Sequence, residues 1–151
     1  MSKITRDQIT GMNFHYKHYP LEYFLDAMVR YECKNIELWG ASPHFYVDEL
    51  SLQDIKNIKR EIDRRNLSVV CFTPEQCVYP INLAAREDGI RKRSIQYFIK
   101  SAEAAKELEA PLSQHGYQGS LTLEYTSYQY VQNPDEAMER TLDVLSGVLA
   151  D

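Results

Sequence analysis

Apolar positions along the chain alternate between short, nearly continuous runs and runs at helical spacing. The clearest short run is residues 35–40, in which Ile36 and Leu38 flank Glu37 ahead of Trp39 and a glycine. A carboxylate is costly to bury without a partner, and parallel α/β sheets gather reactive side chains at the carboxyl ends of their strands. We therefore predict that residues 35–40 form a strand with the functional site at its carboxyl end.

The flanking segments repeat an order of strand followed by helix. Residues 10–14 form the first predicted strand, and residues 67–72 form a third that is typical of a strand covered on both faces. The helix after the first strand is opened by Pro20, and its apolar face holds Phe24, Leu25, Met28 and Tyr31. A capping box of Ser51 and Asp54 opens the next helix. The expected buried positions of the second and third helices are Ile55, Ile58 and Ile62 in the second, and Ile95, Phe98, Ile99, Ala102 and Ala105 in the third, over residues 89–108.

The regular alternation of predicted strands and helices stops after the third helix. Residues 109–119 carry no strand pattern, although the helix should lead directly into a strand. A strand is predicted at residues 120–124, ending in Glu124, and Asn133 caps a last helix that carries Ala137, Leu142, Leu145 and Leu149. Four such units predict a parallel sheet with right-handed crossovers and a site at one edge.

Composition narrows the class of protein. The 151 residues are 44% hydrophobic and suffice for one domain with its own core. A formal net charge of −5 without a cluster of Lys and Arg argues against a nucleic-acid partner. The polar N-terminus and the lack of long apolar runs predict a cytoplasmic protein with no membrane segment. Cys33, Cys71 and Cys77 lack metal-site spacing and indicate reduced thiols, with a reactive Cys77 as the alternative.

Three groups of residues together resemble one known family. They are residues 36–40 with Pro43 and His44, residues 73–75 with Tyr79, Pro80 and Asn82, and Gly116, Tyr117 and Gly119 leading to Leu123 and Glu124. The combination is similar to the sugar phosphate isomerase/epimerase superfamily, the xylose isomerase-like TIM barrels, and within it to the fructoselysine 3-epimerases. The resemblance covers residues 11–109 and 113–149.

This resemblance implies an α/β fold that is a partial (β/α)8 TIM barrel. The first region resembles barrel strands one to three with their helices, and the second resembles strand eight with its helix. The chain would then be one incomplete domain, residues 1–151, with four βα units, a parallel sheet and a junction near residues 112–113. Since strand eight lies beside strand one in a closed barrel, this half-barrel can pair its strands in the order last, first, second, third.

The resemblance also implies metal-dependent chemistry on a sugar. The family holds a divalent metal (Mn, Mg or Co) with Glu, Asp, His and Glu from strands five to eight, and two glutamates move a proton on a ketose through an enediolate. Only Glu124 matches one of these ligand positions, so it is the predicted catalytic residue and metal ligand. Because hard cations need several oxygen donors, we expect the isomerase or epimerase activity of this chain to be impaired. That the chain binds no metal at all stays an open alternative.

Seven further residues are candidate contacts for a sugar in this family: His15, Glu37, Trp39, His44, Glu75, Tyr79 and Asn82. Each has an ordinary alternative. Glu37 could be a buried carboxylate paired with Lys or Arg, Trp39 could pack at the barrel rim, and a lone loop histidine is often only solvated. Glu75, Tyr79 and Asn82 share a loop that two prolines stiffen, which favours substrate contact.

Two functional classes therefore stay open. One is a sugar isomerase or epimerase acting on a ketose or fructosamine, incomplete in this chain. The other is a non-catalytic half-barrel that binds carbohydrate or serves as an assembly module. A half-barrel leaves two sheet edges and an inner face, expected to be apolar, without cover. We therefore expect a homo-oligomer with a small-molecule sugar as its substrate.

Overall fold

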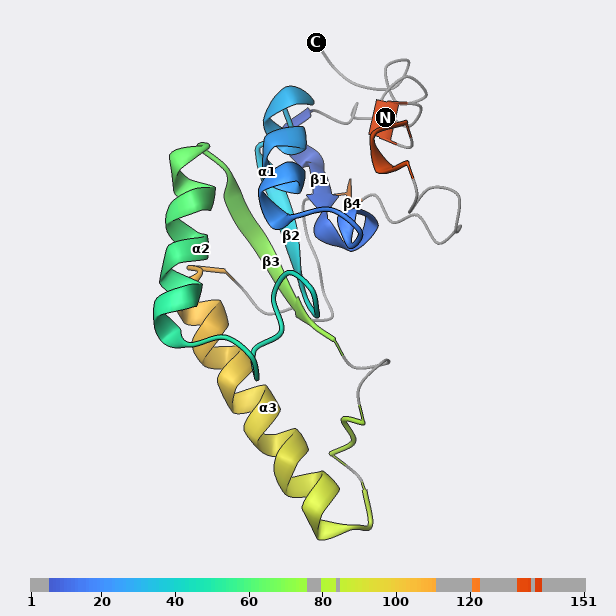
Figure 1. Ribbon diagram of the computed structural model, residues 1–151, viewed down its shortest axis with the longest axis vertical. Helices are drawn as coiled ribbons and strands as arrows, with labels where there is room; N and C mark the ends of the chain where they lie inside the picture. Colours follow the sequence, from blue (N-terminus) through green and yellow to red (C-terminus); the bar gives the residue numbers. More distant parts are fainter. Residues whose placement is uncertain are drawn as a thin grey trace.

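Strands and helices alternate along the part of the chain that a computed structural model describes, residues 6–75, 80–83, 85–110, 121–122, 133–136 and 138–139. The strands are β1 (Ile9–Met12), β2 (Asn35–Gly40), β3 (Ser68–Pro74) and β4 (Leu121–Thr122). The helices are α1 (Leu21–Arg30), α2 (Leu52–Arg64) and α3 (Asp88–Glu107), with short 3-10 helices η1 (Arg6–Gln8) and η2 (Asn13–Tyr16) (Figure 1). The predicted order of βα units is thus confirmed for the first three.

The four strands form one parallel sheet in the order β3-β2-β1-β4. Ile9 and Thr10 of β1 pair with Leu121 and Thr122, so the last strand lies beside the first. This is the order expected for strands eight, one, two and three of a barrel. The α/β half-barrel architecture is therefore confirmed.

Local signals in the sequence account for the first two helices. At the start of α2, Ser51 Oγ accepts a hydrogen bond from the Asp54 backbone N at 3.2 Å, and the Asp54 carboxylate accepts one from the Ser51 backbone N at 2.9 Å. The predicted capping box is therefore present. The predicted apolar faces also hold, since Phe24, Leu25 and Met28 of α1 and Ile55 and Ile62 of α2 are buried. None of the helices described here is long and apolar enough to cross a membrane.

Two predicted strand boundaries were wrong. The first strand was expected over residues 10–14, but β1 ends at Met12 and η2 follows. The reason is that the Asn13 side chain bonds both the N–H and the carbonyl of Trp39, which lets the backbone turn away from the sheet. The third strand was expected over residues 67–72, but β3 runs on to Pro74 because Trp39 and Gly40 of β2 keep pairing with it.

A β-bulge in β3 decides which of its side chains face the helices. Ile36 pairs with Val69 while the next residue, Glu37, pairs with Cys71, so Val70 is an extra residue. Side chains alternate between the two faces of a strand, and one extra residue reverses that alternation. The bulge thereby turns Phe72 toward the helices and the core, where it is fully buried.

The opposite face of the sheet is the one that would line a barrel. A Cβ atom at Gly11 would collide with Met28 of α1, so Gly11 faces the helices and its neighbours face inward. By the register, the inward residues are Thr10, Met12, Asn35, Glu37, Trp39, Cys71 and Thr73. The expectation of an apolar inner face was therefore wrong, because hydroxyl, amide and carboxylate groups occupy most of these positions.

The buried face of α3 also differs from the prediction. Ser94, Tyr97, Ser101, Ala104 and Ala105 are its buried residues. Of the positions expected to be buried, Ala105 is correct and Phe98 is partly buried, whereas Ile95, Ile99 and Ala102 are exposed. Small residues let the helix approach the sheet and α2 closely, and this packing outweighs the apolar period. The isoleucines are left on the outside.

Asp135 and Glu139, near the end of the chain, lie against the region of α1. Asp135 accepts hydrogen bonds from the Tyr16 hydroxyl at 3.1 Å, from Arg30 at 3.2 Å and from the Tyr23 hydroxyl. Burial, together with the neighbouring carboxylate, raises the pKa of Tyr16 and keeps it a donor. The Glu136 backbone N donates to Asn133 Oδ1 at 3.4 Å, which confirms the predicted cap.

We expect Gly40→Ala to lower the free energy of unfolding by about 1–3 kcal/mol. A Cβ atom at Gly40 would lie 2.8 Å from Phe72 Cζ and 3.3 Å from the Pro74 Cα, and the buried ring has little room to move. Urea unfolding followed by circular dichroism measures the change. Gly89→Ala is the control, because nothing lies within 4 Å of its new Cβ, and it should be neutral or stabilising. Equal losses in the two variants would contradict the packing argument.

Candidate functional site

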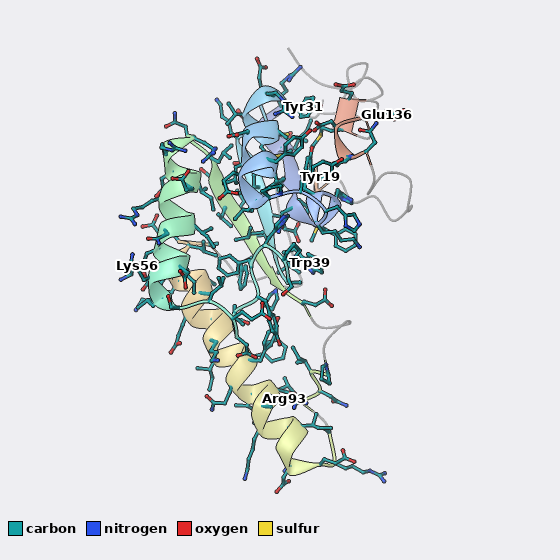
Figure 2. All side chains as sticks on the ribbon, viewed as in Figure 1. Tyr19, Tyr31, Trp39, Lys56, Arg93 and Glu136 are labelled. Atoms are coloured by element: carbon teal, nitrogen blue, oxygen red, sulfur yellow. The ribbon has the colours of Figure 1, made fainter. Side chains whose placement is uncertain are left out.

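Four of the predicted site residues lie at or just beyond the carboxyl ends of β1, β2 and β3, and Glu37 lies in the middle of β2. The four are His15, Trp39, His44 and Glu75. Because all strand pairings are parallel, these ends meet at one edge of the sheet. Hydrogen bonds and ring contacts join Trp39, His44 and Glu75 into one network, and Trp39 is labelled in Figure 2.

Asn13 links the ends of β1 and β2 and was not predicted. It is fully buried, its Oδ1 accepts from the Trp39 backbone N at 2.6 Å, and its Nδ2 donates to the Trp39 carbonyl at 3.2 Å. The same amide lies 3.2 Å from His44 Nδ1. An asparagine after a strand is common, so the pattern along the chain offered no signal for this role.

His44 connects Asn13 to the turn ahead of α1. Its Nδ1 faces the Asn13 amide, and its Nε2 lies 2.7 Å from the Tyr19 carbonyl. A carbonyl can only accept, so Nε2 carries the proton and Nδ1 accepts from Asn13. Burial lowers the pKa of His44 below its ordinary value, against the opposing effects of the Tyr19 carbonyl and Glu22. The imidazole is therefore neutral, with both nitrogens bound to protein groups.

Trp39 is held by contacts on two sides. Its indole Nε1 donates to Glu75 Oε2 at 2.6 Å, and both side chains are more than 90% buried. Phe14 packs edge-to-face against the indole, with ring centroids 4.9 Å apart. The Lys17 ammonium lies 4.8 Å from the centre of the Phe14 ring. This arrangement fixes the plane of the only tryptophan in the sequence.

Glu37 lies two residues before Trp39, on the inward face of β2. Its Oε1 accepts a hydrogen bond from Thr73 Oγ1 at 2.6 Å. Thr73 reaches Glu37 only because the bulge at Val70 turns it inward. Cys71 lies beside them, and burial raises the pKa of its thiol, so this cysteine is held in the protonated form and is not an activated nucleophile.

His15 shares this edge of the sheet, whereas Asn82 lies next to α3 and two other predicted residues lie outside the described part of the chain. His15 is buried in η2, with its ring edge-to-face to Phe14 at 5.4 Å. The Asn82 side chain is exposed, and its backbone N donates to Ser94 Oγ of α3 at 2.8 Å. Figure 1 shows the segment of residues 80–83 between the end of β3 and the start of α3. Tyr79, Cys77 and Glu124 lie outside the described residues, and β4 is described up to Thr122.

Divalent-metal binding was tested against the described donors. Among these residues, no three His, Cys, Asp or Glu side chains converge as a metal site would require. Glu75 is bonded to the Trp39 indole and Glu37 to the Thr73 hydroxyl. One carboxylate at each place does not provide the several oxygen ligands that a hard cation needs. The described donor set therefore does not fit a metal.

A separate cavity of about 560 Å³ lies at the opposite end of the sheet. Its lining includes Arg6, Glu32, Cys33, Lys34 and Arg65, which belong to the amino-terminal ends of the strands and the ends of the helices. In barrels of parallel strands the amino-terminal end contributes to stability, and the carboxyl end carries function. This cavity is therefore not the candidate site.

We expect Glu75→Ala to destabilise the fold by about 1–3 kcal/mol, since it leaves the buried indole N–H without its acceptor. Trp39 is the single tryptophan, so its emission reports this site directly. Urea unfolding followed by tryptophan fluorescence should show both a lower midpoint and an altered native spectrum. Glu75→Gln is the matched control, because its amide oxygen can still accept. A native spectrum unchanged in Glu75→Ala would show that the bond does not hold the indole.

Stability should fall as the pH drops below about 6.5, the ordinary pKa of histidine. The folded state keeps His44 neutral and its pKa is lowered, so the unfolded chain binds the proton more readily. Acid therefore favours unfolding, and this contribution is fully present only above that pH. Urea unfolding between about pH 5.5 and 7.5 should show a smaller slope for His44→Gln. His18→Gln, at an exposed histidine, is the control variant; an equal reduction of the slope in both variants would assign the effect elsewhere.

Comparisons with known proteins agree with this architecture. A family model described as Xylose isomerase-like TIM barrel matches residues 25–115. The fructoselysine 3-epimerases of Escherichia coli O157:H7 and Shigella flexneri are each 31% identical over 75 residues, which is 50% of this chain and 27% of the relative. The chain thus matches about a quarter of the length of these curated relatives.

A solved structure shows the same fold at a larger size. The crystal structure of D-psicose 3-epimerase in the presence of D-fructose superposes with a TM-score of 0.56 and 8% identity, over 93% of this chain and 48% of that chain. At this identity the likeness concerns the fold alone. The family match covers more than half of the sequence and takes in β2, β3, α2, α3 and the end of α1. The chain belongs to the xylose isomerase-like TIM barrel family.

Proposed function

We propose that this chain is a sugar isomerase/epimerase-type protein whose site lies at the carboxyl ends of β1, β2 and β3. The observation that carries the proposal is the Trp39–Glu75 pair, a buried carboxylate that fixes an indole at the end of the sheet. Its relatives are named for epimerising fructoselysine and D-psicose. The proposed substrate is accordingly a ketose or a fructosamine.

The proposed roles divide the site into a wall and a set of polar groups. Trp39 supplies a flat apolar surface for one face of a sugar, with its orientation set by Glu75 and Phe14. Glu37 and Thr73 face inward from the neighbouring strands and can exchange hydrogen bonds with sugar hydroxyls. His44 holds the loop after β2 against the segment between β1 and α1, through its contacts with Asn13 and the Tyr19 carbonyl.

Further sugar contacts belong to the proposal through the family pattern. They are His15, Tyr79 and Asn82, together with a direct contact by His44. Asn82 has the exposed side chain that such a contact needs. In the same pattern Glu124 would act as the base and as a metal ligand. The position of Glu124 just after β4, the strand beside β1, is what supports this part of the proposal.

We propose that proton transfer on the sugar is impaired in the isolated chain. Such chemistry needs a Lewis acid to stabilise the developing oxyanion and a placed carboxylate to move the proton. The described donor set does not fit a divalent metal. The proposed contacts Trp39, Glu37 and Thr73 can still bind and orient a sugar, because binding requires fewer converging groups than a metal centre does.

The second candidate function is non-catalytic, a half-barrel that binds carbohydrate or serves as an assembly module. The exposed isoleucines of α3 favour an assembly role, since they offer apolar surface outside the core. Homo-oligomerisation is common to both candidates. A cytoplasmic location, expected from the sequence, stays a prediction.

We expect ketoses and fructosamines to change Trp39 fluorescence at millimolar concentration, while turnover stays undetectable. Turnover is measured by proton NMR in D2O, where enediolate formation exchanges the hydrogen at the epimerised carbon. Calorimetric titration with Mn²⁺ accompanies it, with Glu124→Ala as the test variant. Glu103→Ala, at an exposed position on α3, is the control.

Each result has a distinct meaning. A fluorescence response without turnover supports a sugar site that has lost its metal chemistry. Turnover or tight Mn²⁺ binding that Glu124→Ala abolishes and Glu103→Ala preserves would show that the chain does assemble a metal centre, contrary to the proposed impairment. If no ketose or fructosamine causes either a fluorescence change or turnover, the sugar-site proposal itself is contradicted.

A further inference from the structure

One flank of α3 carries exposed apolar side chains. Ile95 and Ile99 are 43% and 46% exposed, Ala102 is also exposed, and Phe98 beside them is partly buried. These four residues are called the α3 apolar flank below. Isolated apolar residues on a surface are ordinary, but here they adjoin one another along a single helix at spacings of three and four.

The α3 apolar flank points away from α2. The opposite flank of α3 meets the α2 region through two ion pairs, Lys100 with Asp48 at 2.6 Å and Glu107 with Lys56 at 3.8 Å. With a period of 3.6 residues, Lys100 and Glu107 lie on the other side of the helix from the apolar flank. The apolar flank therefore borders the side where the next βα unit of a barrel would lie.

The sheet is open on that same side. β3 is the terminal strand in the order β3-β2-β1-β4, and among the described residues it pairs with β2 alone. Its outer edge presents backbone donors and acceptors over Ser68–Pro74. An open edge of this kind is a template for pairing with another strand, and parallel sheets are found with both faces covered by helices.

We propose that two copies of this chain close one eight-stranded barrel, and that the β3 edge with the α3 apolar flank is the surface through which they join. Each copy contributes its four strands. The two-fold axis coincides with the barrel axis. β3 of each copy pairs with β4 of the other, so the two seams are identical.

This symmetry is compatible with the strand directions. A two-fold rotation about the barrel axis leaves every strand pointing the same way, so the new pairings are parallel like those within the chain. Closure removes both open edges at once. It also brings the α3 apolar flank to the side of the second copy on which its own β4 lies, where helices pack around a complete barrel.

Length favours a second copy of this chain over an unrelated partner. The superposition with D-psicose 3-epimerase uses 93% of this chain and 48% of the larger one. Two copies therefore supply about the amount of structure in one complete neighbour. A second copy also brings the same parallel strands, whereas a peptide or a lone helix could cover the isoleucines but would not close the sheet.

In the closed barrel the two copies would share one carboxyl-terminal end, where the carboxyl ends of all eight strands lie. Both sets of Glu37, Trp39 and Glu75 would face that end from opposite sides. A sugar bound at one set would then be enclosed by the other copy. The inference concerns assembly, goes beyond the proposed function, and does not require the chain to be catalytic.

The mass of the chain in solution tests the inference. Light scattering after size exclusion, from about 1 to about 100 µM, should show a species with twice the 17.6 kDa of the chain. The double variant Ile95→Glu/Ile99→Glu places two carboxylates in the joined surface and should raise the dimer dissociation constant at least about 100-fold. Circular dichroism checks that the variant keeps its fold.

Two matched controls separate the α3 apolar flank from exposed apolar surface in general. Val29 on α1 and Leu52 on α2 are 48% and 53% exposed, close to the two isoleucines. Val29→Glu and Leu52→Glu should leave the dimer intact. A dimer weakened as much by these controls as by the double variant would overturn the proposal, as would a dimer that the double variant does not affect.

Hydrogen exchange gives a second measurement that needs no variant. In the closed barrel the β3 amides should be protected at high protein concentration and lose protection on dilution, while those of β2 stay protected throughout. This result decides the question even if the double variant fails to fold. A monomer across the whole concentration range, or β3 exchange independent of dilution, would overturn the inference. Neither outcome would affect the proposed sugar site.

Discussion

The parallel direction of every strand pairing is the constraint on which the rest of this structure depends. It brings the carboxyl ends of β1, β2 and β3 to one edge, where Asn13 can join them and Glu75 can hold Trp39. It also requires helices on the outer face, which explains why Phe24, Met28 and Ile62 are buried there. A parallel sheet without closure keeps two edges, and so the same constraint that builds the site leaves β3 open.

Contacts between the two ends of the chain decide which strands become edges. β4 pairs with β1, and Asp135 receives hydrogen bonds from Tyr16, Tyr23 and Arg30. The carboxylate thereby replaces its lost hydration with three donors. The last described strand is thereby fixed beside the first, as strand eight lies beside strand one in a full barrel. In the described part of the chain, the sheet edges without a partner strand are then the outer sides of β3 and β4, which the proposed second copy would fill by symmetry.

The site combines a rigid scaffold with few chemical groups. Hydrogen bonds fix the indole of Trp39 and the neutral ring of His44, and the Thr73 hydroxyl bonds the carboxylate of Glu37. The proposed sugar site rests on these fixed side chains, because they set the orientation of a bound molecule. Proton transfer assisted by a metal needs several oxygen donors at one point, which the described residues do not bring together.

Local patterns in the sequence determined the βα order, the capping box of Ser51, the cap at Asn133 and the position of β2, because these depend on neighbours within a few residues. The family pattern also located Trp39, His44 and Glu75 at one edge. It did not reveal Asn13, since a buried amide is defined only by the groups around it. Tertiary structure alone decided the bulge that turns Thr73 toward Glu37 and the face that α3 buries. The apolar period favoured Ile95 as a buried residue, but packing against the sheet and α2 buries the small residues of α3 instead. The sequence of one helix does not specify the shape of the elements that it packs against, so this outcome could not be predicted.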